Sequence, residues 1–127
     1  MNEHTNLLEI KDRTVHYVTV DGTVHAVENL NLPLPEGKTL GLVGETGAGK
    51  TTTVKAIMQI LPDPPAKILT GEVIFCGEDL LKKNKKSMRK IRGKQISMIF
   101  QDPMTTLNPV ITVGGQIMEV IRLHDKK

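Results

Sequence analysis

The sequence predicts an α/β fold in which an antiparallel β-subdomain over about residues 1–37 leads into an α/β core over about residues 38–127. The N-terminal third is rich in strand-forming residues, and its dipeptide Asp21-Gly22 is a strong signal for a hairpin turn. A glycine-rich loop then joins an apolar run to an amphipathic segment, which is the strand–loop–helix order of an α/β unit. With 127 residues, 39% of them hydrophobic and 24% charged, the composition is that of one globular domain.

The first elements are all expected to be strands. Their apolar, β-branched and aromatic residues predict strands over residues 7–10, 14–20, 23–27, 30–34 and 39–43. Pro33 lacks a backbone N–H group, so its strand is expected at a sheet edge or at a bulge. A turn over residues 35–37 leads into the run at residues 39–43.

The segment after the glycine-rich loop is predicted to be a helix over residues 50–61. Its apolar side chains form one stripe for packing against a sheet, with helical spacing at Val54, Ile57, Met58 and Leu61. Prolines from residue 62 onward end this helix. Strands over residues 72–76 and 96–100 follow, and Cys76 is expected to be a buried, inert thiol. A last helix is expected to be capped by Thr112 and to present an apolar face at Ile117, Val120 and Ile121.

The glycine-rich loop carries the chemistry. It matches the pattern G-x-x-x-x-G-K-[ST] with Gly44, Glu45, Thr46, Gly47, Ala48, Gly49, Lys50 and Thr51. Glycine lacks a Cβ atom, so backbone N–H groups can approach an anion closely, and the next helix adds its positive N-terminal end. We expect Lys50 to reach the β- and γ-phosphates, Thr51 to ligate Mg²⁺ and Thr52 to contact the α-phosphate. The pattern predicts a P-loop NTPase core with ATP and Mg²⁺ as cofactors.

Charge and the remaining residue types restrict the partners, metal sites and locations that the sequence predicts. A net charge of +3 is too small to indicate nucleic acid as a partner. The basic run at residues 82–94 has two interpretations, a contact with acidic lipid or nucleic acid, or a solvated helix and loop. His16 and His25 are not expected to cluster with other ligands, so no metal besides nucleotide-bound Mg²⁺ is predicted. The sequence has no apolar stretch of membrane-spanning length and no signal-peptide pattern at its start, so a membrane-spanning or secreted chain is not expected.

Two stretches together resemble the ATP-binding subunit of ABC transporters. The first is Gly-Leu-Val-Gly-Glu-Thr-Gly-Ala-Gly-Lys-Thr, ending at Thr51, and the second runs from Ile91 through Phe-Gln-Asp-Pro to Leu-Asn-Pro at Pro109. The second stretch resembles the Q-loop of the family, and its sequence is similar to that of the Q-loop in the dipeptide, oligopeptide and nickel importers. The resemblance extends from about Leu7 to His124. It implies that Gln101 approaches Mg²⁺ and the attacking water, so that Lys50 and Gln101 would be the catalytic residues.

The resemblance also implies an aromatic ring that stacks on adenine. Tyr17 is the only tyrosine and lies in a suitable strand. Aligning residues 26–27 with the usual small-apolar pair instead places the aromatic position nearer Thr19. Two alternatives therefore stay open for Tyr17, an adenine platform or an ordinary sheet residue.

Several parts of that family's site have no counterpart in the sequence. The Ser-Gly-Gly-Gln signature, the Walker B strand ending in Asp-Glu and the switch histidine are all absent. The run Thr-Val-Gly-Gly-Gln at residues 112–116 follows Gln101 too closely to be the signature. The chain thus resembles the N-terminal part of a subunit, expected to bind Mg-ATP but to hydrolyse it poorly. We also expect an uncovered sheet edge, and with it non-native oligomers or poor solubility.

The partners implied by the resemblance are the transmembrane permease subunits of an importer and a second ATP-binding subunit that completes a dimer. Such a subunit is peripheral, on the cytoplasmic face of the plasma membrane. Two alternatives remain, a soluble ABC ATPase outside transport and a non-catalytic nucleotide-binding module.

Overall fold

The computed structural model describes residues 6–47 and 49–125 of the chain. These residues form two compact units, one up to Asn84 and one from Lys85 onward. The first unit contains the sheet and the loop that precedes helix α1, and the second contains helices α2 and α3. The sheet includes two strands that come after position 37 in the sequence. The predicted boundary between a β-subdomain and an α/β core near that position stays a prediction.

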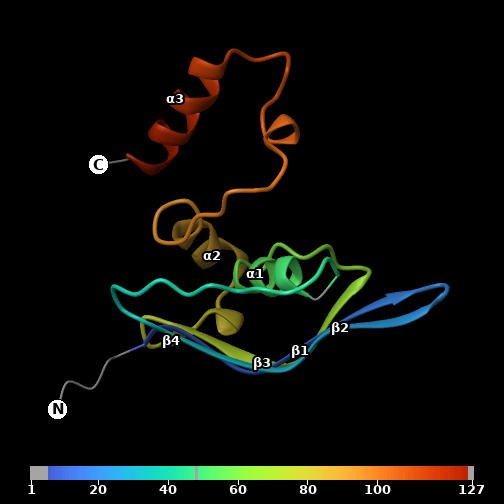
Figure 1. Ribbon diagram of the computed structural model, residues 1–127. Coiled ribbons are helices and arrows are strands. Elements are labelled where there is room, and N and C mark those ends of the chain that lie inside the picture. Colours follow the sequence, from blue (N-terminus) through green and yellow to red (C-terminus); the bar gives the residue numbers. More distant parts are fainter. Residues whose placement is uncertain (1–5, 48, 126–127) are drawn as a thin grey trace. The chain divides into compact units, whose positions relative to one another are not determined.

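The first unit is built on a four-stranded antiparallel sheet (Figure 1). Its strands, in the order β2-β1-β3-β4, are β1 (Asn6–Thr19), β2 (Gly22–Pro35), β3 (Ala66–Phe75) and β4 (Glu78–Asp79). The predicted hairpin is confirmed, but its turn lies one residue earlier than expected, because Thr19 pairs with Gly22. The strands predicted at residues 7–10 and 14–20 form one strand, with an irregularity between Ile10 and Arg13.

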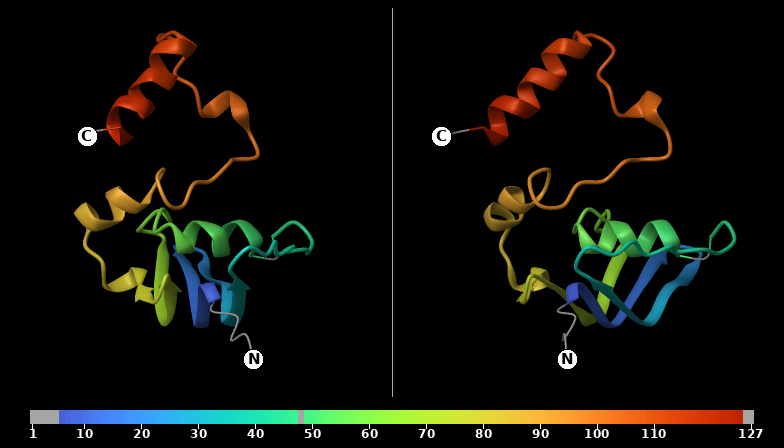
Figure 2. Two further views of the ribbon diagram at one scale, coloured as in Figure 1. Left: turned by 90° about the vertical axis from the view of Figure 1, so that its left-hand side faces the viewer. Right: turned by 60° about the vertical axis from the view of Figure 1, so that its left-hand side comes forward.

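Helix α1 (Lys50–Ile57) covers one face of this sheet (Figure 2). Ala56 packs with Val15 and Val27 in a buried apolar cluster that Leu30 and Leu61 extend. The helix is shorter than predicted, because Gln59 has a φ of 52° and so leaves the right-handed helical region. The predicted buried stripe is only partly correct: Met58 is buried, but Val54 is exposed while Thr53 and Ala56 face the interior.

Two predicted strands are absent from the described residues. Residues 39–43 and 96–100 contain no strand, apart from an isolated bridge between Arg92 and Ile96. A strand is stable only when a neighbour pairs with its N–H and C=O groups, and neither run has such a neighbour here. Their apolar side chains are accordingly open to solvent, as in Val43 at 92% and Ile99 at 97% exposure. The expected oligomerisation through such surfaces stays a prediction.

Cys76 is exposed, so the prediction of a buried thiol was wrong. The residue follows the last residue of β3 and begins the turn to β4, with a φ of 49°. A strand continuing through this position would have placed the thiol in the sheet, whereas the turn points it into solvent. The thiol therefore does not contribute to the apolar core.

The second unit consists of helix α2 (Lys85–Ile91), a 3₁₀ turn (Pro103–Thr105) and helix α3 (Val113–His124). In α2, Met88 and Ile91 are buried and the cationic side chains are exposed, which fits both interpretations of the basic run. The predicted cap of α3 is confirmed, because the Thr112 hydroxyl accepts a hydrogen bond from Gly115 N at 3.2 Å. None of the described helices is both long and apolar enough to cross a membrane.

Candidate nucleotide-binding site

The glycine-rich loop lies between residues 39–43 and the start of α1. Gly47 and Gly49 both adopt positive φ angles, 86° and 83°, which side chains with a Cβ rarely adopt. A Cβ atom at Gly49 would stand 2.2 Å from the carbonyl oxygen of Ala26 in β2, whereas one at Gly47 would meet nothing within 4 Å. The loop thus rests against the sheet at Gly49 and is open at Gly47. Ala48, also predicted to bind nucleotide, lies outside the described residues.

Lys50 folds back over this loop. Its ammonium group donates hydrogen bonds to the carbonyl oxygen of Glu45 at 2.7 Å and to that of Gly44. Helix α1 begins at the same residue, with no side-chain cap and no acidic residue in its first turn. A lysine cation and the positive end of a helix therefore meet at the loop, with no carboxylate in the first helical turn to oppose them.

The threonines of the first turn have different surroundings. The hydroxyl of Thr53 donates to Gly49 O at 2.9 Å, and the Thr53 N–H donates to the same oxygen at 2.8 Å, which ties the loop to the helix. Thr51 is exposed, so its hydroxyl is accessible to an ion. Thr52 shares a 3.2 Å hydrogen bond with the hydroxyl of Tyr17 on β1. Of the three, Thr51 is exposed, Thr52 is half-buried and Thr53 is buried.

Tyr17, which was predicted as a possible platform for adenine, is held against the first turn of α1 by its hydrogen bond to Thr52. Tyr17 is at the same time a regular sheet residue, paired with Val24 in β2 and Ala66 in β3. The structure thus joins Tyr17 to the first turn of α1, and a role in stacking on adenine stays a prediction.

Gln101 belongs to the second unit, where it lies in an exposed bend. Its predicted approach to Mg²⁺ stays a prediction. Asp102 next to it forms a turn, because its carboxylate accepts a hydrogen bond from Met104 N at 3.0 Å.

The signature-like run at residues 112–116 has a local structural role. Gln116 accepts a hydrogen bond from Asn108 N at 2.9 Å and donates to the carbonyl oxygens of Asn108 and Ile111, both at 3.0 Å. Its amide therefore closes the loop that leads into α3. All its described partners lie in this loop, as expected if the run is not the signature.

The described residues fit a magnesium nucleotide. A polyphosphate requires positive charge and backbone that it can approach closely, and the loop combines Lys50, the α1 N-terminus and the open backbone at Gly47. The exposed hydroxyl of Thr51 is an oxygen donor of the kind Mg²⁺ prefers.

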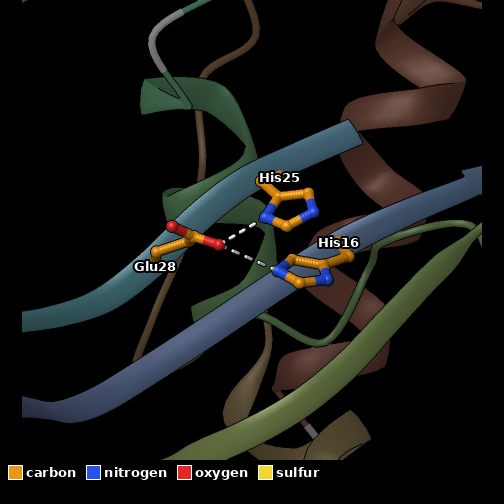
Figure 3. Close-up of side chains that lie close together, drawn as sticks. All are labelled: His16, His25 and Glu28. Carbon is orange, nitrogen blue, oxygen red and sulfur yellow. Dashed lines mark hydrogen bonds and ion pairs between the residues drawn. The ribbon is translucent and has the colours of Figure 1, made fainter. Parts of the chain in front are cut away.

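The sequence prediction missed one cluster of ligand-type side chains. His16, His25 and Glu28 lie together on the β1–β2 hairpin (Figure 3), so the expectation that the two histidines stand apart from other ligands was wrong. Because the turn lies at Val20-Asp21, His16 and His25 are direct cross-strand partners. Placing the turn correctly in the sequence would therefore have predicted that the two histidines lie side by side. The predicted turn at Asp21-Gly22 would instead have placed Val27 opposite His16.

Comparison with known proteins gives consistent results. The sequence pattern described as "ABC transporter" matches residues 27–126. The chain is 48% identical over 122 residues to the oligopeptide transport ATP-binding protein OppD of Bacillus subtilis, covering 96% of this chain and 34% of that protein. It is 45% identical over 120 residues to the dipeptide transport ATP-binding protein DppD of the same organism, covering 94% of this chain and 36% of that one. The chain thus spans about a third of the length of these relatives.

A solved structure shares the fold. The dimeric structure of MJ0796, described as a bacterial ABC transporter cassette, superposes with a TM-score of 0.80 at 23% sequence identity. The match covers 94% of this chain and 49% of the solved chain. A second structure of that cassette, in a post-hydrolysis state bound to ADP and Pi, superposes with a TM-score of 0.79. At this identity the similarity establishes the fold.

Proposed function

The chain belongs to the ABC transporter family, and on that premise we propose that it is the nucleotide-binding part of an ATP-binding subunit that energises a peptide importer. The names of the relatives, oligopeptide and dipeptide transport ATP-binding proteins, support the substrate class. The observation that carries the nucleotide assignment is the loop, where the Lys50 ammonium group lies over Gly44 and Glu45 at the start of α1.

Each loop residue has a role in this proposal. Lys50 leaves its carbonyl partners to bind the β- and γ-phosphates, and the N–H groups of the loop and of the first turn of α1 surround the phosphate oxygens. The Thr51 hydroxyl would ligate Mg²⁺, and Gln101 would approach the same ion and orient the attacking water. When bound, Mg²⁺ neutralises charge that develops on the phosphoryl group during transfer.

Hydrolysis needs more than these groups. The sequence contains no Asp-Glu pair of the Walker B type, which would supply the carboxylate that positions water. We infer that the 127 residues by themselves bind Mg-ATP and turn it over slowly. The whole subunit would form a dimer with a second ATP-binding subunit and would bind the transmembrane permease subunits of the importer. It would be a peripheral protein on the cytoplasmic face of the plasma membrane. Nucleic acid has no part in this proposal.

The test is ATP affinity in Lys50→Ala, measured by titration with a fluorescent ATP analogue in the presence of Mg²⁺. Loss of hydrogen bonds from a charged group predicts a binding free energy weaker by about 1.5–3 kcal/mol, roughly 10- to 150-fold in Kd. Lys55→Ala is the matched control, because Lys55 lies in the last turn of the same helix and its loss removes the same charge. Equal affinities of wild type and Lys50→Ala would refute the assignment.

The same titration separates the two roles of Tyr17. If its ring stacks on adenine, Tyr17→Phe retains affinity and Tyr17→Ala loses it. If the residue serves only the sheet, both variants bind ATP like the wild type. Isolation of the whole subunit with or without a membrane permease then distinguishes an importer from a soluble ABC ATPase.

A further inference from the structure

The cluster of His16, His25 and Glu28, here called the hairpin cluster, lies on the β1–β2 hairpin (Figure 3). Nδ1 of His25 lies 2.5 Å from Glu28 Oε1, and Nε2 of His16 lies 3.4 Å from the same oxygen. The two imidazole rings are stacked, with centroids 4.0 Å apart and planes inclined by 25°. All three ligand-type atoms lie within 4.8 Å of one another.

A bulge in β2 makes this convergence possible. In a regular strand, residues three apart point to opposite faces, so His25 and Glu28 would be separated by the sheet. Val15 pairs with Val27 and His16 pairs with His25, which leaves Ala26 as an extra residue on β2. The extra residue reverses the alternation and turns His25 and Glu28 to one face.

That face is the one opposite the apolar core. Val15 and Val27 pack with Ala56 of α1, and their strand neighbours His16 and Glu28 therefore point away from the helix. The cluster is thus separate from the side chains that pack α1 against the sheet, although it shares strands β1 and β2 with them.

The contacts within the cluster are incomplete as hydrogen bonds. Both ring nitrogens face one carboxylate oxygen, but only His25 forms a hydrogen bond with it. Nε2 of His16 is buried and has no hydrogen-bond partner among the described residues. One cation at the centre would satisfy all three ligand atoms together.

We propose that the hairpin cluster binds one divalent transition metal ion of the Zn²⁺ type through His16 Nε2, His25 Nδ1 and the Glu28 carboxylate. Zinc–nitrogen and zinc–oxygen bonds of about 2.0–2.2 Å at tetrahedral angles place neighbouring ligand atoms about 3.3 Å apart. The separation of His16 Nε2 and Glu28 Oε1, 3.4 Å, already matches this value.

The other contact must open to admit the ion. His25 Nδ1 and Glu28 Oε1, now 2.5 Å apart, must separate by about 0.8 Å to reach tetrahedral spacing. Both side chains are more than half exposed, at 57% and 54%, so small rotations toward solvent suffice. Metal binding at His25 Nδ1 requires the proton between Nδ1 and Glu28 Oε1 to move to His25 Nε2 or to solvent, and a water molecule takes the fourth position.

The donor set selects the class of metal. Two imidazoles and one carboxylate suit zinc and its neighbours among the transition metals. Mg²⁺ and Ca²⁺ prefer six or more oxygen donors, and this cluster offers them a single carboxylate. The site is therefore distinct in chemistry from the Mg²⁺ that accompanies a nucleotide.

The test is calorimetric titration of the metal-free, nucleotide-free chain with ZnCl₂. We expect one Zn²⁺ bound per chain, undisturbed by excess Mg²⁺. Co²⁺ used as a spectroscopic probe should give the intense visible bands of four-coordinate cobalt with nitrogen and oxygen ligands. Absence of stoichiometric Zn²⁺ binding, or its loss to competition by Mg²⁺, would overturn the proposal.

Matched variants locate the ion. His25→Asn and Glu28→Gln, both at exposed positions, should weaken Zn²⁺ binding by at least about tenfold while retaining the wild-type circular dichroism spectrum. His124→Asn and Cys76→Ser remove ligand-type groups elsewhere and should bind Zn²⁺ as tightly as the wild type. If Cys76→Ser alone abolishes binding, the ion sits at the thiol and the proposal is wrong.

The site does not depend on the proposed function. Lys50→Ala should bind Zn²⁺ normally while losing affinity for ATP, and His25→Asn should show the reverse pattern. Failure of one assignment therefore leaves the other intact. Zn²⁺ affinity that falls with Lys50→Ala and not with His25→Asn would place the ion at the nucleotide loop and refute the hairpin cluster as its site.

Discussion

Replacement of Gly49 by alanine tests how closely the glycine-rich loop packs against the sheet. The backbone there has a φ of 83°, and a residue with a Cβ pays about 1–2 kcal/mol to adopt it. The new Cβ would also lie 2.2 Å from Ala26 O and 3.3 Å from Ala26 C, both backbone atoms. Carbon atoms pack favourably at about 3.5–4.0 Å, so the loop or β2 must move by roughly 1 Å.

The size of the effect follows from what has to move. Ala26 is the bulge residue of β2, and its neighbour Val27 belongs to the buried cluster with Val15 and Ala56. Displacing packed structure by an added methyl group costs typically about 1–3 kcal/mol. Together with the backbone term, Gly49→Ala should lower the free energy of unfolding by about 2–5 kcal/mol. Loss of that much can unfold a protein whose total stability is about 5–15 kcal/mol.

Gly47→Ala is the control, because the two glycines share the backbone strain and differ in their surroundings. Gly47 has a φ of 86°, and a Cβ there would meet nothing within 4 Å. It should cost only the backbone term of about 1–2 kcal/mol. The assay is urea unfolding followed by circular dichroism, for wild type and both variants. If Gly49→Ala is no more destabilising than Gly47→Ala, the contact with Ala26 does not hold the loop and the reasoning fails.

Two further predictions concern charged side chains. Arg13 is 1% exposed, with Nε and Nη2 lacking hydrogen-bond partners among the described residues, and burial lowers its pKa despite the nearby Asp79. Arg13→Met, which retains the apolar stem, should raise the free energy of urea unfolding by about 1–3 kcal/mol, whereas Arg13→Ala should lower it; a loss in both would show that the charge is stabilising. The hydrogen bond from Lys83 lowers the pKa of Glu78 below its ordinary value of 4.5. Because the folded pKa is the lower one, this contribution is present above that value and lost as the pH falls through the folded pKa; the stability difference between wild type and Glu78→Gln should shrink in acid, and a constant difference would contradict it.

The glycine-rich loop, which we propose binds nucleotide, could be recognised in the sequence because its chemistry is local. Consecutive residues from Gly44 to Thr51 supply the glycines, the cation and the hydroxyl group, and spacing along the chain already brings them together. The cap of α3 by Thr112 was predictable for the same reason, since its partner is Gly115, three residues away. The close contact of Gly49 with Ala26 was not, because β2 is distant in sequence.

Apolar runs were a weaker guide. Residues 39–43 and 96–100 have the composition of buried strands, but burial also requires neighbouring strands that pair with them. Arg13 lies between the strands predicted at residues 7–10 and 14–20, where the sequence predicted no strand. The irregularity in β1 continues the strand through this position, and the guanidinium group is enclosed.

The sequence by itself determined the family resemblance, the hairpin, the phosphate-binding pattern and the groups available to a nucleotide. Only the tertiary structure decided that His16 faces His25, that Glu28 joins them, and that Tyr17 contacts Thr52. The physical reason is register. One residue of difference in the hairpin turn changes every cross-strand pair, and one bulge reverses which face a side chain occupies, while neither event alters the local pattern from which a strand is predicted.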